Sequence, residues 1–210
     1  MENIVIVGSG GFAKEVAFLI KEINQQTPKW NLLGYIDREI GKKVQNLKVI
    51  ENDEWLQNCP DKINAVVGIG NPSIIEEIAT NLNQNKNISF PNLIHPNNIG
   101  DWDNINLGHG NIISSGCNLT TDITINNFNI INLDSTIGHD TTIGNYNLIN
   151  PSCNISGCVN IKNNCLIGTG TSIIENISLA SEIIIGAGSV ITKNITEKGV
   201  YVGVPAKKIK

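Results

Sequence analysis

The sequence predicts two parts of different fold class, a small α/β domain with a parallel sheet followed by a parallel β-helix. Apolar, strand-like segments alternate with amphipathic, helix-like segments over roughly the first 93 residues, which is typical of an α/β unit. From Leu107 onward, an Ile or Leu recurs at every sixth position up to Ile191. Aromatic residues make up only 5% of the 210 residues, so a core of stacked β-branched layers is expected.

The N-terminal segments predict three buried strands and two helices. Strands are expected at residues 3–8, 30–37 and 62–70, and helices at residues 12–25 and 72–84. Pro72 can open the second helix because a first-turn proline loses no needed hydrogen bond. The polar stretch between the second and third strands shows no clear pattern. Together these segments predict a small Rossmann-like parallel sheet over residues 1–93.

The second half, residues 94–210, carries the six-residue repeat. A helix has a period of 3.6 and a simple strand a period of 2, so a strict hexad predicts a parallel β-helix with the Ile/Leu column pointing inward. Three sides close one coil, and the fifteen hexads therefore predict about five coils. The repeat ends near Thr192, and the open end of the β-helix needs a cap.

Two other positions of the hexad are also patterned. The residue two before each Ile or Leu is often small, so Cys117, Cys153 and Cys165 are expected to pack in the core. The residue directly after the Ile or Leu is often Gly or Asn. These residues tolerate a left-handed backbone, which we expect at this position of each tight corner.

Composition excludes several classes of protein. The net charge is −4 and no block of basic residues occurs, so no nucleic-acid partner is expected. We find neither a signal peptide nor an apolar run long enough to cross a membrane, and we expect a cytoplasmic protein without membrane insertion. The five cysteines form no CxxC pair, so they are expected to be reduced thiols without a metal site.

Nearly the whole chain resembles a known family. The resemblance is carried by "GSGGFAKEV", "GYID", "GIGN", "NLIHP", the hexads, "IGHD", "IGTGTSI", "IGAGSVI" and "EKGVYVGVPAKK". These motifs are similar to those of the hexapeptide-repeat sugar acetyltransferases, a NeuD- and PglD-like family of nucleotide-linked 4-amino-sugar N-acetyltransferases and sialic acid O-acetyltransferases. The resemblance implies a left-handed β-helix, which parallel crossovers alone would not predict.

The same resemblance implies an activity and an assembly. We expect an acetyl-CoA-dependent N-acetyltransferase that acetylates the 4-amino group of a UDP- or dTDP-linked 4-amino-deoxy sugar for surface-glycan biosynthesis. The alternative is an O-acetyltransferase acting on sialic acid or a related sugar. A homotrimer is implied, in which acetyl-CoA lies between neighbouring β-helices and no metal takes part.

His139 is the candidate general base. It lies two residues after Ile137, so the register places it at a corner and outside the core. Imidazole suits proton transfer because it titrates near neutral pH, and the resemblance gives His139 this role, with Asp140 supporting it. From periodicity alone, a His–Asp pair that only satisfies itself and solvent is an equal alternative.

Four further residues are candidate acetyl-CoA contacts. Gly157 follows His139 by eighteen residues, one full coil, and the resemblance implies that its N–H faces the thioester carbonyl. Asn147 stands where relatives often have a second histidine that contacts acetyl-CoA. Thr169 and Ala187 stand at pantetheine-contact positions, although corner geometry alone explains them equally well. No cysteine is expected at the active-site corner, which favours direct attack of the amine on the thioester.

The candidate nucleotide-sugar contacts lie in the N-terminal half. Gly10 and Gly11 form a glycine-rich turn whose N–H groups can hold a phosphate, a pattern that would equally suggest NAD. The resemblance directs this turn to a nucleotide sugar. The other candidates are Phe12, Asp37, Arg38 and Gly70, of which Asp37 can accept hydrogen bonds from a base or a ribose.

Overall fold

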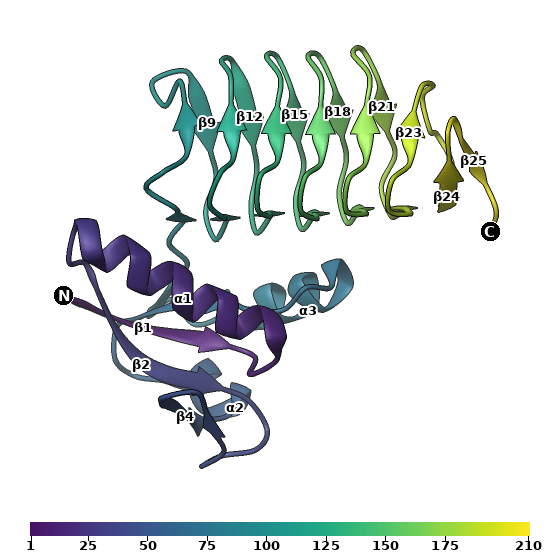
Figure 1. The fold of residues 1–210 in the computed structure, drawn as a ribbon. Helices are drawn as coiled ribbons and strands as arrows, with labels where there is room; N and C mark the ends of the chain where they lie inside the picture. The colour runs from purple at the N-terminus through teal and green to yellow at the C-terminus, as the bar shows by residue number, and fades with distance from the viewer.

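The computed structural model describes all residues 1–210 and divides into an α/β domain and a β-helix (Figure 1). The N-terminus lies in the α/β domain, and the C-terminus lies at the far end of the β-helix. The two parts confirm the predicted fold class. No helix has the length and apolar character that a membrane span would need.

The α/β domain is built on a six-stranded sheet of order β3-β4-β2-β1-β5-β6. All neighbours are parallel except β3 and β4. The strands are β1 (Glu2–Val7), β2 (Trp30–Ile36), β3 (Lys43–Val44), β4 (Leu47–Glu51), β5 (Ile63–Val67) and β6 (Ile88–Ser89). The helices are α1 (Gly11–Gln26), α2 (Asp53–Gln57) and α3 (Pro72–Leu82).

The expected strands and helices of this domain are present, but the stretch between the second and third strands is not irregular. It forms β3, β4 and α2, and β4 adds a parallel neighbour to β2. These elements are short and partly exposed, so they lack the long apolar pattern by which the other elements were recognised.

The β-helix has three parallel sheets, one along each side of a triangular coil. The first sheet begins with β7 (Leu93–Ile94), β10 (Ile112–Ile113), β13 (Ile130–Ile131), β16 (Leu148–Ile149), β19 (Leu166–Ile167) and β22 (Ile183–Ile185). The second holds β8 (Ile99–Gly100), β11 (Asn118–Leu119), β14 (Thr136–Ile137), β17 (Asn154–Ile155), β20 (Ser172–Ile173) and β23 (Val190–Ile191). The third holds β9 (Ile105–Leu107), β12 (Ile123–Ile125), β15 (Thr142–Ile143), β18 (Asn160–Ile161) and β21 (Ser178–Leu179).

These strands make five complete coils and part of a sixth, as the hexad count predicted. Neighbouring strands pair in a register of eighteen residues, for example Ile113 with Ile131 and Ile137 with Ile155. Every residue of the Ile/Leu column except Leu107 is buried, and so are Cys117, Cys153 and Cys165. The first strand of the β-helix begins at Leu93, one residue before the predicted boundary.

The left-handed backbone does not occur where we expected it. It falls three residues after each column residue from Leu107 to Ile185, for example at Asp134, Asp140 and Tyr146. The preference for glycine directly after the column residue has another physical reason. A Cβ on Gly138 would lie 2.5 Å from the backbone nitrogen of Gly157 in the next coil, so close stacking of the coils excludes a side chain there.

The C-terminal residues form the cap that the open end of the β-helix requires. β24 (Gly199–Gly203) adds a parallel strand to β22, and β25 (Ala206–Lys208) turns back antiparallel to β24. The last coil is closed by a bridge between Leu179 and Ile195. The cap replaces the unpaired sheet end that a bare coil would expose.

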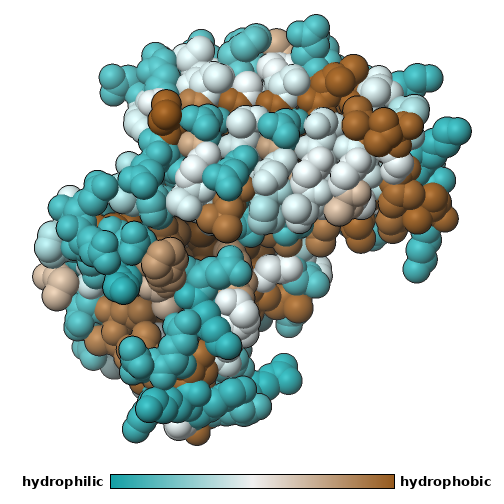
Figure 2. All heavy atoms as spheres, in the orientation of Figure 1, coloured by the Kyte–Doolittle hydropathy of each residue, from teal (hydrophilic) through white to brown (hydrophobic).

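The α/β domain packs on the first sheet of the β-helix. The outward-facing residues Ile112, Ile130 and Leu148 of that sheet belong to the same buried cluster as the domain core. Phe90 and Phe128 meet edge to face across this junction, with ring centroids 5.0 Å apart. Figure 2 shows hydrophobic residues gathered between the two parts, while the visible flank of the coils is mostly polar or neutral.

Candidate active site

The turn between β14 and β15 presents His139 and Asp140 to solvent. Thr141 anchors the turn: it is buried, and its hydroxyl donates to the carbonyl of Ser156 at 3.2 Å. Asp140 has the left-handed backbone of this corner, with φ of 57°. The side chains of His139 and Asp140 are 58% and 60% exposed. His139 therefore lies outside the core, as the register predicted.

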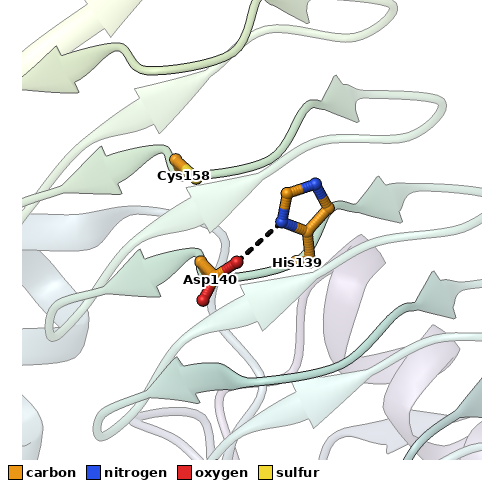
Figure 3. Close-up of side chains that lie close together, drawn as sticks. All are labelled: His139, Asp140 and Cys158. Atoms are coloured by element: carbon orange, nitrogen blue, oxygen red, sulfur yellow. Dashed lines mark hydrogen bonds and ion pairs between the residues drawn. The ribbon is translucent and has the colours of Figure 1, made fainter.

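The pair has a defined geometry (Figure 3). Nδ1 of His139 lies 2.7 Å from Oδ2 of Asp140. An ionised carboxylate can only accept, so Nδ1 is the donor, and in the neutral ring Nε2 keeps its lone pair. This tautomer leaves Nε2 able to accept a proton from a substrate, which is the task of a general base.

Gly157, one coil further along, lies directly against the imidazole. A Cβ on Gly157 would be 2.6 Å from Nε2 and 2.7 Å from Cε1 of His139. The ring therefore uses space that any other residue would fill. Gly157 is buried and its N–H has no acceptor within the chain, so it can donate to a ligand that reaches it beside the ring. The eighteen-residue spacing predicted this stacking.

Thr169 and Ala187 lie at another edge of the coil. They belong to exposed turns that join the first and second sheets, whereas the turn of His139 joins the second and third. Their backbone N–H groups also lack acceptors within the chain. A single chain does not bring them to His139, although they can offer donors to a ligand along their own edge.

Asn147 does not fit the predicted contact with acetyl-CoA. It is fully buried, in the turn between β15 and β16. Its Nδ2 donates to Asn129 at 3.0 Å, and its Oδ1 accepts from the backbone N–H of Cys165 at 2.8 Å. The amide belongs to an internal ladder with Asn111, Asn129 and Cys165 at eighteen-residue spacing. Its place two residues before Ile149 was the signal for burial.

Cys158 corrects a second expectation, that no cysteine lies at this corner. It follows Gly157, is exposed, and has Sγ within 4.8 Å of the ligand atoms of His139 and Asp140. Its backbone N–H donates to the carbonyl of His139 at 2.8 Å. The eighteen-residue register from Asp140 leads directly to Cys158, so the sequence held the signal.

The second candidate region is the edge of the α/β sheet where β1, β2 and β5 end. A pocket of about 200 Å³ there is lined by Gly8, Asp37, Arg38, Asp53 and several apolar residues. Gly8 has φ of 98°, and a Cβ would lie 2.8 Å from Ile69, so glycine is required at this turn. The pocket brings together Asp37 and Arg38 from the predicted set.

Asp37 is held by donors on both oxygens. Ser9 donates from its hydroxyl to Oδ2 at 2.5 Å, and the N–H of Arg38 donates to Oδ1 at 2.7 Å. Burial acts to raise the pKa of Asp37, but the bonds from Ser9 and Arg38 outweigh it and lower the pKa below its usual value. Asp37 is thus an ionised acceptor at the mouth of the pocket.

Sequence reasoning missed Ser9 and Asp53. Ser9 lies inside the glycine turn that was recognised only for its backbone. Asp53 lies in the stretch taken as irregular, and burial followed by the nearby charge of Asp37 raises its pKa. Asp53 lies near the end of β2 only because β4, which precedes it, pairs with β2, and β4 has no strong sequence signal.

The remaining predicted residues surround this edge. Gly10 precedes α1 and Gly11 begins it; both have open space where a Cβ would stand, and no side chain caps the helix. The first N–H groups of α1 are thus free for an anion. Phe12 is half-buried and packs against the domain core. A Cβ added to Gly70 would lie 3.9 Å from the side chain of Leu148 in the β-helix.

A larger cleft of about 570 Å³ starts beside Gly70, at Asn71 and the first turn of α3, and continues over the first sheet to Leu166 and Ile184. Asn164 donates to Glu76 at 2.9 Å across the junction. The cleft lies on the side of the α/β domain, whereas the turn of His139 joins the second and third sheets and so lies at the edge of the coil opposite the first sheet.

Comparisons with known proteins agree with this architecture. Residues 3–82 match the family model of the PglD N-terminal domain. No curated protein sequence matches the chain. Among solved structures, PerB from Caulobacter crescentus, in complex with CoA and GDP-perosamine, is 23% identical, with a TM-score of 0.91 over 100% of this chain and 98% of that one.

Two further structures have the same fold. A histidine mutant of perosamine N-acetyltransferase from Caulobacter crescentus, with CoA and GDP-perosamine, is 22% identical, with a TM-score of 0.90 over 100% of this chain and 98% of that one. The acetyltransferase domain of PglB from Neisseria gonorrhoeae, with acetyl coenzyme A, is 24% identical, with a TM-score of 0.90 over 99% of both. The chain therefore has a PglD-type N-terminal domain followed by a left-handed β-helix.

Proposed function

We propose that this chain is an acetyl-CoA-dependent N-acetyltransferase that acetylates the 4-amino group of a UDP- or dTDP-linked 4-amino-deoxy sugar for surface-glycan biosynthesis. The observation that carries the proposal is the His139–Asp140 pair resting on Gly157. Structures of similar fold contain CoA or acetyl-CoA, and two of them contain GDP-perosamine as well, which supports both the chemistry and the class of substrate.

The arrangement fits direct attack. The sugar amine attacks the thioester carbon, the carbon–sulfur bond breaks, and CoA leaves as a thiolate. Nε2 of His139 takes the proton that the amine must lose, while Asp140 keeps Nδ1 protonated and stabilises the charged ring. The free N–H of Gly157 can donate to the oxyanion that forms at the thioester carbonyl.

The α/β domain would hold the nucleotide. Asp37 accepts hydrogen bonds from the ribose or the base, and the uncapped start of α1, at Gly10 and Gly11, takes the diphosphate. Arg38 lines the same pocket and can meet the base or a phosphate. The sugar would then extend past Gly70 into the large cleft.

A single chain does not join these two parts, because His139 and the cleft lie on opposite sides of the β-helix. A homotrimer resolves this separation: the cleft of one subunit faces the His139 corner of the next, and acetyl-CoA lies between β-helices, where Thr169 and Ala187 of a neighbour can contact its pantetheine arm.

The second candidate is an O-acetyltransferase acting on sialic acid or a related sugar. It would use the same base on a hydroxyl, which is a far weaker acid than the conjugate acid of an amine. The nucleotide-type pocket at Asp37 favours the N-acetyltransferase.

The test is release of CoA thiol by the purified protein with UDP-, dTDP- and GDP-linked 4-amino-6-deoxy sugars and with free sialic acid, for wild type and His139→Ala. We expect turnover with a UDP or dTDP amino sugar and a loss of about 10²–10⁴-fold in the mutant, the usual contribution of a general base. Turnover only with sialic acid would replace the proposal by its alternative.

Mixed assemblies test the shared site. With the nucleotide sugar well below its KM, His139→Ala and Asp37→Asn chains are each expected to be weakly active alone. Co-refolded mixtures are expected to recover activity because some sites combine intact halves. The assembly should have three times the chain mass of 22.7 kDa by light scattering. A fully active monomer would refute the trimeric site.

A further inference from the structure

The side chains of His139, Asp140 and Cys158, here called the corner cluster, bring three different donor types to one exposed edge. Their ligand atoms all lie within 4.8 Å of one another. Figure 3 shows Cys158 on the side of the imidazole that faces Asp140, away from Nε2. An imidazole nitrogen, a carboxylate oxygen and a thiol sulfur therefore converge on the Nδ1 side of the ring.

No other corner of the β-helix repeats this set. Asp140 and Cys158 occupy the same position of successive turns, and the same column contains Asp122 before them and Asn176 after them. Only the turn of His139 adds an imidazole beside this column. The cluster follows from the stacking of two particular turns, and the bond from the Cys158 N–H to the His139 carbonyl holds those turns together.

The donor set fits a zinc-class cation. Zinc binds His nitrogen, carboxylate oxygen and Cys sulfur at about 2.0–2.3 Å in tetrahedral geometry, which sets neighbouring ligand atoms roughly 3.3–3.8 Å apart. The pair now at 2.7 Å needs to open slightly, and the sulfur needs to move in from at most 4.8 Å. All three side chains are exposed, so rotation about their χ angles meets little resistance.

The charges and protons balance. The ion brings two positive charges, and the Asp140 carboxylate and the Cys158 thiolate bring one negative charge each. The thiol gives its proton to solvent. The imidazole stays neutral but changes tautomer: the ion replaces the proton at Nδ1, and Nε2 becomes the protonated nitrogen.

We propose that the corner cluster is an inhibitory binding site for a zinc-class divalent cation. The bound ion occupies Nδ1 of His139, so Nε2 carries a hydrogen and no longer accepts the substrate proton. The inhibition rests on the proposed function, in which Nε2 is the base, whereas binding of the ion does not. A fourth coordination position stays open for water or a thiolate, including that of CoA.

Binding is tested without any substrate. The full-length protein is stripped with a chelator and titrated with Co²⁺, which reports a thiolate ligand by its sulfur-to-cobalt charge-transfer absorption, and with Zn²⁺ in a calorimeter. We expect one ion per chain, one proton released on binding, and the charge-transfer band. Cys158→Ser and Cys158→Ala are expected to lose the band and at least about tenfold in Zn²⁺ affinity.

Asp122→Asn serves as the matched control, because it removes a carboxylate from the same column one coil away. It should keep the band and the affinity. The proposal is refuted if wild type shows no band, or if the band survives in both Cys158 variants.

Activity then separates the two proposals. Cys158→Ser should match wild type without metal and resist Zn²⁺ concentrations that inhibit wild type. Inhibition of wild type and Cys158→Ser at equal Zn²⁺ would refute the inhibitory role. If the ion binds at the cluster but wild-type turnover continues, the inhibitory role fails and His139 is not the base, so the proposed mechanism fails as well while the binding of the ion stands.

Discussion

Replacing Gly157 by alanine tests whether the position of His139 matters for turnover. The added Cβ would lie 2.6 Å from Nε2, and ordinary contact begins near 3.4 Å. The ring must therefore retreat by about 0.8 Å, or turn away from its place beside Asp140. A misplacement of about 1 Å can cost roughly 100-fold in rate, so we expect kcat/KM to fall about 10- to 100-fold.

The stability of the protein should hardly change. The imidazole is exposed by more than half and can swing into solvent, and the backbone of Gly157 is outside the left-handed region. Gly157 is itself buried, but the nearest atoms that an added Cβ would meet belong to the exposed imidazole, so we expect a change in unfolding free energy of less than about 1 kcal/mol. The assay combines CoA thiol release with chemical denaturation.

A double-mutant cycle isolates the cause. If the alanine acts by moving His139, then Gly157→Ala should have little further effect in a His139→Ala background. Equal losses in both backgrounds would show that Gly157 acts independently of the imidazole, for example through its own N–H. Unchanged activity in the single mutant would refute the argument from packing.

Four other predictions concern the ladder, the thiols and the nucleotide pocket. Asn147→Ala leaves the buried Cys165 N–H without its acceptor, while Asn129 Oδ1 keeps the backbone N–H of residue 147. It should cost about 1–3 kcal/mol of unfolding free energy, measured by denaturation, and leave the KM for acetyl-CoA unchanged in the active fraction. Of the five cysteines, only Cys158 is exposed, so one thiol of the native chain should react rapidly with a disulfide reagent. Cys158→Ser should show no rapidly reacting thiol, and a second such thiol in wild type would contradict the packing of the other cysteines in the core. Burial raises the pKa of Cys117, Cys153 and Cys165 from 9.0 to about 11. The unfolded chain loses these protons at lower pH than the folded chain, so the unfolding free energy should fall as the pH rises from 9 to 11. Cys158→Ser should show the same fall, and a flat profile would contradict the burial of the three thiols. Asp37→Asn should raise the KM for the nucleotide sugar about tenfold or more, because it weakens a charge-assisted hydrogen bond. The KM for acetyl-CoA is the internal control, and an equal rise in both KM values would contradict a nucleotide-specific role.

The sequence predicted most of the β-helix because its geometry is local and repeats. One hexad sets one side of the coil, so Ile137 inward implies His139 outward, and Gly157 and Cys158 follow one coil later at fixed spacing. The error about the left-handed position arose from reading glycine as a sign of backbone conformation. At Gly138 the cause is instead contact with the next coil, which residue type alone does not reveal.

The candidate site residues also divide into those that the sequence could predict and those that it could not. The glycine turn and Asp37 could be found because strand ends of a parallel sheet carry recognisable residues. Asp53 could not, because β4 and α2 are short and gain their place from packing against β2. Asn147 was misassigned because its polar amide suggested a ligand contact, whereas a ladder of buried amides satisfies itself.

By itself, the sequence determined the two fold classes, the register of every coil and the corner that carries His139 and Asp140. Only the tertiary structure decided that the α/β domain packs on the first sheet, through Ile112, Ile130 and Leu148, and so leaves its cleft on the far side of the β-helix from His139. The physical reason is range: a six-residue period fixes neighbours within and between coils, but which face of the β-helix another domain covers depends on side-chain packing between segments far apart in the chain.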